Sequence, residues 1–106
     1  HCAGLAIGPI ETALGYRYGV ASGADLYVAK VFNTHNRASE SDVILALTWA
    51  QSMKCSVASM SLVFRVVSPE NDQLFDEVVA GVTNEGLLVV AACGNDTDRR
   101  RGRRVG

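Results

Sequence analysis

The 106-residue sequence contains no apolar run that approaches the roughly 20 residues of a membrane-spanning helix. It has only three cysteines, and this odd number without a Cys-x-x-Cys spacing predicts neither a zinc site nor a complete disulfide framework. Neither His1 nor His35 has a metal-type partner nearby in the sequence. The sequence therefore predicts no membrane contact and no bound metal.

The sequence also lacks the glycine-rich loops that bind nucleotide phosphates. No G-x-G-x-x-G follows a predicted strand, and no G-x-x-x-x-G-K-[ST] occurs. The loops after the predicted strands, at residues 33–36, 63–65 and 94–96, do not have the composition of a phosphate-binding loop. We therefore predict no nucleotide and no other cofactor.

Positive charge is scarce along most of the chain and concentrated near its end. Five of the ten basic residues are the arginines of 99–104, so residues 1–98 hold the other five together with all eleven acidic residues. No aromatic side chain lies among these arginines, and a stacking surface for nucleic acid is not expected. We interpret residues 97–106 as an Arg-rich loop or the truncated end of an element, and predict no nucleic-acid partner.

The middle of the chain has the pattern of alternating strands and helices. Residues 25–32 and 55–62 read as strands, and residues 39–53 read as a helix with an apolar face. Ser39 with Asp42 three residues later is a capping signal for the start of that helix. Before them, residues 1–24 suggest the end of one short helix followed by a glycine-rich winding loop.

A second helix and a third strand complete the pattern. Ser68 is a candidate N-cap, Pro69 suits the first helical position, and Gly86 suits the left-handed residue that ends a helix. The apolar stripe of this helix is expected at five positions, Leu74, Phe75, Val78, Val79 and Val82. With a strand at 87–93, the order predicts an α/β fold, a three-layer parallel sheet with helices on both faces.

The segment 87–96, LLVVAACGND, carries the strongest chemical signal. It is a continuous apolar run that stops at Gly94 and is followed by the amide Asn95. Ligands bind at the carboxyl ends of strands in open parallel sheets, and an amide there can donate to developing negative charge. Gly-Asn-Asp is also the composition of an ordinary turn, and from these residues alone the turn is the favoured interpretation.

Five segments together resemble the subtilisin-like serine proteases, the subtilases. HCAG at 1–4 is similar to the end of H-G-T-x-[VC]-A-G, slightly like proteinase K, and GVASGADLYVAKVF at 19–32 is similar to G-V-A-P-x-A-x-L-Y-A-V-K-V-L. Trp49-Ala50 falls at the family's E-W-A, and VASMSL at 57–62 resembles V-I-N-M-S-L. LLVVAACGND resembles V-V-V-V-A-A-A-G-N-[ED], and all five occur in family order.

The resemblance implies roles for the matching positions. Asn95 matches the asparagine that stabilises the oxyanion of the tetrahedral intermediate. Two segments match the walls of the primary specificity pocket, where an extended peptide is bound: Ser61, Leu62, Ala92, Cys93 and Gly94. Residues 36–39 match a second substrate-binding edge, and a plain loop with a helix cap explains them equally well.

The resemblance also implies that the catalytic triad is absent. His1 stands three residues after the position of the family's catalytic histidine, and the motifs for the aspartate and the nucleophilic serine are not found. We therefore expect residues 1–106 to be an internal fragment of one catalytic domain, inactive alone, from a serine endopeptidase that is secreted or extracellular and acts on peptides or proteins.

Departures from the family pattern keep a second class of function open. Val63-Phe64 stands where Gly-Gly is usual, and Ser59 stands where asparagine is common. Branched or bulky residues in place of glycine would crowd the substrate cleft. A non-catalytic pseudoprotease or an α/β binding module is therefore the alternative.

Overall fold

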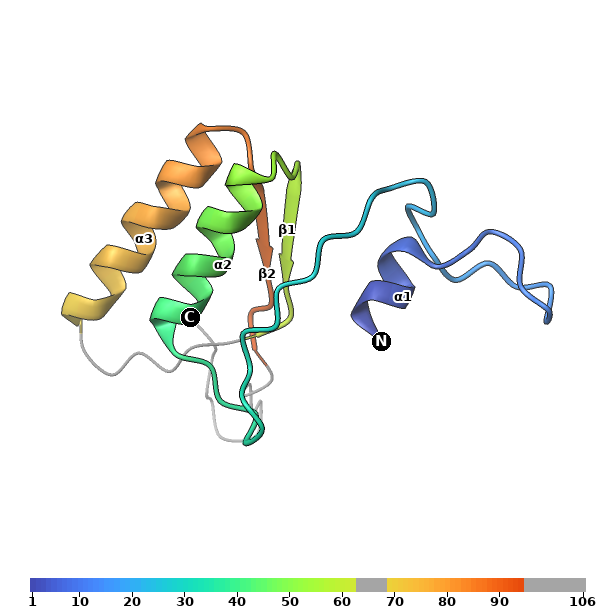
Figure 1. Ribbon diagram of the computed structural model, residues 1–106, viewed down its shortest axis with the longest axis horizontal. Coiled ribbons are helices and arrows are strands. Elements are labelled where there is room, and N and C mark those ends of the chain that lie inside the picture. The colour runs from blue at the N-terminus through green and yellow to red at the C-terminus, as the bar shows by residue number, and fades with distance from the viewer. Residues whose placement is uncertain (63–68, 95–106) are drawn as a thin grey trace, which may run out of the picture.

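The computed structural model describes residues 1–62 and 69–94 of the chain (Figure 1). Three helices and two strands occur there, in the order α1 (Cys2–Ile7), α2 (Glu40–Ser52), β1 (Val57–Met60), α3 (Pro69–Asn84) and β2 (Leu88–Ala91). This order of helices and strands agrees with the α/β class that the sequence predicts.

The two strands form a parallel sheet. Val57 is paired with Leu88 and Met60 with Ala91, and the ladder continues with a bond of 3.1 Å from the Ala92 amide to the Met60 carbonyl. Because α3 connects the strands, the β1–α3–β2 unit is the crossover that a parallel pair requires. The predicted parallel arrangement is therefore confirmed.

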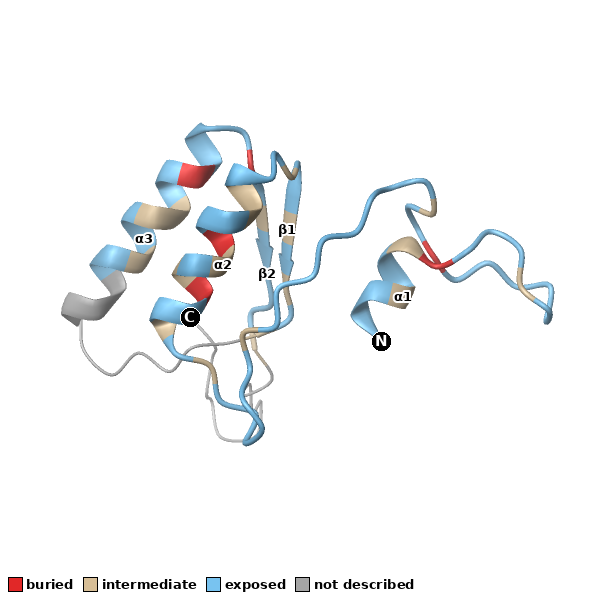
Figure 2. Cartoon of the chain, viewed as in Figure 1, coloured by how far each residue is buried: buried red, intermediate tan, exposed pale blue. Residues whose placement is uncertain are grey.

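The core lies between the sheet and the two longer helices, which run side by side along one face of it (Figures 1 and 2). Its buried side chains come from α2, α3 and the residue just before β2: Val43, Leu47, Val82 and Leu87. Phe75, Val78 and Val79 pack against them, but the prediction for Leu74 is wrong, because this residue is 57% exposed. A second layer of helices over the other face of the sheet stays a prediction.

The predicted helix boundaries follow from local chemistry. The Ser39 hydroxyl accepts from the Asp42 amide at 3.1 Å while the Asp42 carboxylate accepts from the Ser39 amide, so the capping box is confirmed. Gly86 has a φ of 101°, a left-handed conformation that glycine adopts at little cost, and it leads the chain from α3 to β2. The predicted N-cap at Ser68 lies outside the described residues.

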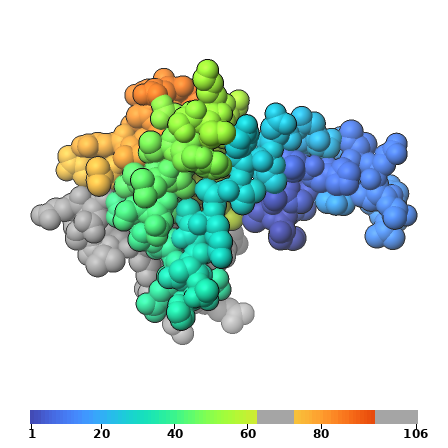
Figure 3. Space-filling view, in the orientation of Figure 1, coloured from blue at the N-terminus to red at the C-terminus, as the bar shows by residue number. Residues whose placement is uncertain are grey.

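The predicted strand at 25–32 is wrong. A strand requires a backbone partner, and in the described chain none of the backbone bonds outside regular elements involves residues 25–32. The segment runs across the front of the molecule between the N-terminal residues and α2 (Figure 3). The Tyr27 ring meets the Trp49 ring edge-on at 6.1 Å, and Val31 packs against the core.

Residues 1–24, here called the N-terminal unit, form a short helix and a loop that folds back against this helix. The amides of Val20 and Ala21 donate to the carbonyls of Leu5 and Ala6, at 3.2 and 2.7 Å. The backbones of Gly8 and Gly19 cross within this unit, and a Cβ at Gly19 would overlap the backbone of Gly8. The predicted short helix and winding loop are therefore confirmed, and the crossing explains two of the glycines.

Replacing Gly19 with alanine should open the N-terminal unit. The added methyl group must displace the Gly8 backbone, at a cost of about 1–3 kcal/mol. Hydrogen exchange of the Val20 and Ala21 amides is expected to become faster in this variant. Gly23→Ala is the matched control, because a Cβ there meets nothing within 4 Å. Equal exchange in the two variants would contradict the crossing.

Candidate functional site

The residues that match a specificity pocket lie at one edge of the sheet. Ser61 and Leu62, the first predicted wall, directly follow β1. Ala92, Cys93 and Gly94, the second predicted wall, directly follow β2. Because β1 and β2 are parallel and in register, both walls begin at the same, carboxyl end of the sheet. The Ala92 amide donates to the Met60 carbonyl, so the first residue of the second wall is bonded to the residue that directly precedes the first wall.

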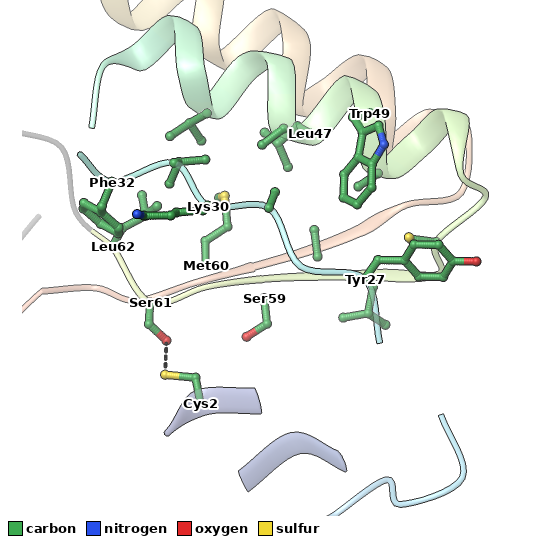
Figure 4. A pocket seen from close by; sticks show the side chains of 18 residues that line it. Cys2, Tyr27, Lys30, Phe32, Leu47, Trp49, Ser59, Met60, Ser61 and Leu62 are labelled. Atoms are coloured by element: carbon green, nitrogen blue, oxygen red, sulfur yellow. Dashed lines mark hydrogen bonds between the residues drawn. The ribbon is translucent and has the colours of Figure 1, made fainter. Parts of the chain in front are cut away.

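The alternation of side chains along β1 gives this edge two different faces. Ala58, Met60 and Leu62 pack against the core beneath the helices. Ser59 and Ser61 are exposed on the other face, where both point toward Cys2 at the start of α1 (Figure 4). The first wall therefore has an apolar side that the core fixes and a hydroxyl side that is open to a ligand or a neighbouring element.

The second wall ends in a sharp change of backbone direction. Gly94 has a φ of 86°, which is the left-handed region that favours glycine. Ala92 and Cys93 are both exposed. Asn95, the predicted oxyanion donor, is the next residue and lies outside the described residues, as does the Val63-Phe64 departure. The structure thus brings five of the six predicted site residues to one edge.

A cavity of about 400 Å³ lies beside the first wall (Figure 4). Its lining comes from residues 27–32, α2 and β1 and is largely apolar, including Tyr27, Phe32, Leu47 and Trp49. Ser61 and Leu62 lie at one end of the lining together with Cys2. No motif in the sequence signals the approach of Cys2 to Ser61, because 59 residues separate them.

The loop before α2 is held by its own hydrogen bonds. The Asn33 side chain accepts from the amides of His35 and Arg37, at 2.9 and 3.1 Å, and Asn36 has a φ of 55°. Ser39 caps α2 as described above. A loop with a helix cap therefore accounts for residues 36–39, and their use as a second substrate-binding edge stays a prediction.

Two further features are not found in the described residues. Within residues 1–62 and 69–94, no group of three or more His, Cys, Asp or Glu side chains is placed so that it could hold a metal ion. No helix in the same part of the chain is long and apolar enough to cross a membrane.

Similarity to known proteins establishes the family. The model of the Subtilase family matches residues 1–105, nearly the whole sequence. The chain belongs to the subtilase family. Its parallel sheet, with both predicted pocket walls at the carboxyl edge, is consistent with the α/β fold expected from that membership.

Curated relatives agree with this assignment. The chain is 36% identical over 90% of its length to subtilisin BL of Lederbergia lenta and to an alkaline protease of Alkalihalobacillus alcalophilus, and 34% identical over 77% to an extracellular serine proteinase of Thermus sp.. It spans 33%, 23% and 19% of these relatives. No solved structure matches this subtilase chain significantly.

Proposed function

We propose that this chain is the substrate-binding part of a subtilisin-like serine endopeptidase and an internal fragment of its catalytic domain. Ser61 and Leu62 form one wall of the specificity pocket, and Ala92, Cys93 and Gly94 form the other. Asn95 supplies the oxyanion donor. The observation that carries the proposal is the parallel register of β1 and β2, which brings both walls to one sheet edge immediately before Asn95.

The chemistry follows from what these residues offer. Exposed backbone beyond β1 and β2 can pair with an extended peptide, which then adds to the walls as a strand. The neutral amide of Asn95 donates a hydrogen bond to the carbonyl oxygen as it gains negative charge. The serine nucleophile, the histidine base and the aspartate that orients it belong to parts of the protein outside residues 1–106. Residues 1–106 therefore bind the peptide and stabilise charge, and they do not form the acyl intermediate.

The names of the relatives support an extracellular protease that acts on peptides or proteins. One of them is an extracellular serine proteinase, and others are an alkaline protease and subtilisins. We propose the same location and substrate class for the protein that contains this chain.

A non-catalytic relative is the second candidate, and Val63-Phe64 favours it. These residues replace the glycines that leave room for substrate in the family pattern. The coding sequence around residues 1–106 distinguishes the two candidates. A histidine block ending at His1 and a downstream Gly-Thr-Ser block are expected for the endopeptidase, and the absence of either favours the pseudoprotease.

Hydrolysis of peptide nitroanilides tests the proposed activity directly. The intact protein that contains residues 1–106 should hydrolyse such peptides and should be inactivated by a sulfonyl fluoride that reacts with the active-site serine. The 106-residue chain alone should release no nitroaniline. Hydrolysis by the isolated chain would contradict the assignment of the triad to other parts of the protein, and a folded but inactive intact protein would contradict the endopeptidase.

A further inference from the structure

A run of arginines follows the second pocket wall closely in the sequence. This arginine segment begins five residues after Gly94, the last residue of the wall, and consists of Arg99, Arg100, Arg101, Arg103 and Arg104. It lies outside the described residues, but the covalent chain limits its distance from the wall. At no more than about 3.6 Å per residue, the Cα of Arg99 lies within about 18 Å of the Cα of Gly94. The first arginines are therefore tethered near the carboxyl edge of the sheet.

The acidic residues close to the arginine segment in the sequence do not cancel its charge. Asp96 and Asp98 precede it, so residues 95–104 carry five positive and two negative side chains, a net of +3. Residues 1–94 have the opposite balance, with nine acidic and five basic side chains. A net positive charge therefore occurs only in the part of the sequence that directly follows the proposed pocket wall and the oxyanion donor.

We propose that the arginine segment makes the pocket selective for peptides with an acidic side chain at the residue that carries the scissile carbonyl. The inference rests on the proposed function, in which Asn95 binds the oxygen of that carbonyl and Gly94 belongs to the wall beside it. Clustered positive charge near a binding site attracts an anionic substrate and discriminates against a cationic one. A guanidinium can also bind a carboxylate through two parallel hydrogen bonds, which favours glutamate over its neutral isostere glutamine.

Ion pairs with α2 are the competing use of these arginines. Figure 1 shows that α2 begins at the end of the molecule where β1 and β2 finish, and its first turn holds Glu40 and Asp42. The Asp42 carboxylate already accepts from the Ser39 hydroxyl at 2.6 Å. Ion pairs with these carboxylates would contribute to stability and would leave the choice of substrate unchanged, so substrate selectivity distinguishes the two uses.

Peptide nitroanilides that differ only in their last residue test the selectivity in the intact protein. The kcat/KM of the glutamate peptide should exceed that of the glutamine peptide about tenfold at low salt, and the lysine peptide should be hydrolysed more slowly than both. In 1 M NaCl the ratio of glutamate to glutamine should fall to about two, because the Debye length is then only about 3 Å. The glutamine peptide has nearly the size of the glutamate peptide, so the ratio isolates the effect of charge.

Substitutions assign the selectivity to the arginine segment. The combined variant Arg99→Gln, Arg100→Gln and Arg101→Gln should lower the ratio about fivefold, and Arg99→Gln alone about twofold. Lys54→Gln is the matched control for the single substitution. Lys54 is exposed and lies between α2 and β1, at the amino end of the sheet, so removal of its charge should leave the ratio unchanged.

The outcomes separate this inference from the proposed function. An active protein with equal kcat/KM for the glutamate and glutamine peptides, or with the same ratio in the combined variant and in Lys54→Gln, would overturn the acidic selectivity alone. An unchanged ratio together with a lower urea midpoint in the combined variant would assign the arginines to ion pairs instead. An intact, folded protein that hydrolyses none of the three peptides would overturn the proposed function and this inference with it.

Discussion

Replacing Asn95 with leucine in the intact protein is expected to lower kcat by about 10²–10³ with little change in KM. Leucine has nearly the size of asparagine but no donor, so the substrate still binds while the oxyanion loses one hydrogen bond. That bond is stronger in the transition state than in the ground state, and its loss therefore affects the rate of the chemical step. The range is the one known for the corresponding amide of subtilisin, a member of this family, and is carried over from it. Nitroanilide kinetics at saturating and limiting substrate measure both constants.

Asn84→Leu is the matched control for this substitution. Asn84 is the exposed last residue of α3, so it precedes β2 and lies away from the carboxyl edge. Its replacement changes the same chemical group without touching the proposed pocket, and kcat should stay within about twofold. Unchanged turnover in Asn95→Leu, in a protein with an unaltered circular dichroism spectrum, would remove Asn95 from the oxyanion hole.

Local signals and the order of elements were sufficient to predict most of the helices and the parallel direction of the two strands. The capping box of Ser39 and Asp42 fixes the start of α2, and Gly86 ends α3 with a positive φ, because both depend on neighbouring residues only. The parallel pairing of β1 and β2 follows from the helix between them, since a parallel connection needs a crossover. These features are local or follow from element order.

The strand predictions show where local patterns are insufficient. Alternation in residues 25–32 favours a strand, but the backbone bonds outside regular elements in the described residues do not involve this segment, although Val31 packs against the core. The strands at 57–60 and 88–91 are shorter than predicted for a related reason, since each strand extends only as far as its partner continues. Pairing is a property of the whole fold, and the sequence of one segment does not determine it.

For the same physical reason, the sequence predicts one part of the candidate site, the two walls, and not the other, the approach of the N-terminal unit. Both walls follow strands that pair in parallel, so their meeting at one edge could be derived from a parallel sheet. The approach of Cys2 to Ser61 depends on how the N-terminal unit lies against the sheet. No periodicity or motif encodes that placement, because it depends on the path of the chain between two elements that are far apart in the sequence.

Leu87→Ala should destabilise the 106-residue chain more than any other single replacement proposed. Leu87 is 1% exposed and lies where α2, α3 and the start of β2 meet, beside Val43, Leu47 and Val82. Removing its side chain leaves a cavity in a core of few buried residues, which costs about 2–5 kcal/mol. This is a large fraction of the stability of a domain of this size. Urea unfolding followed by the fluorescence of Trp49, the single tryptophan, measures the change.

Leu88→Ala is the matched control for the burial of Leu87. The neighbouring Leu88 is 56% exposed although it lies in β2. The same truncation there removes little buried area and should cost less than about 1 kcal/mol. The difference between adjacent leucines therefore reports which face of β2 the helices cover. Similar losses in the two variants would mean that the chain buries both faces of the sheet, for example in an association of two copies. Sedimentation at the same protein concentration would then distinguish association from a core that differs from the one described.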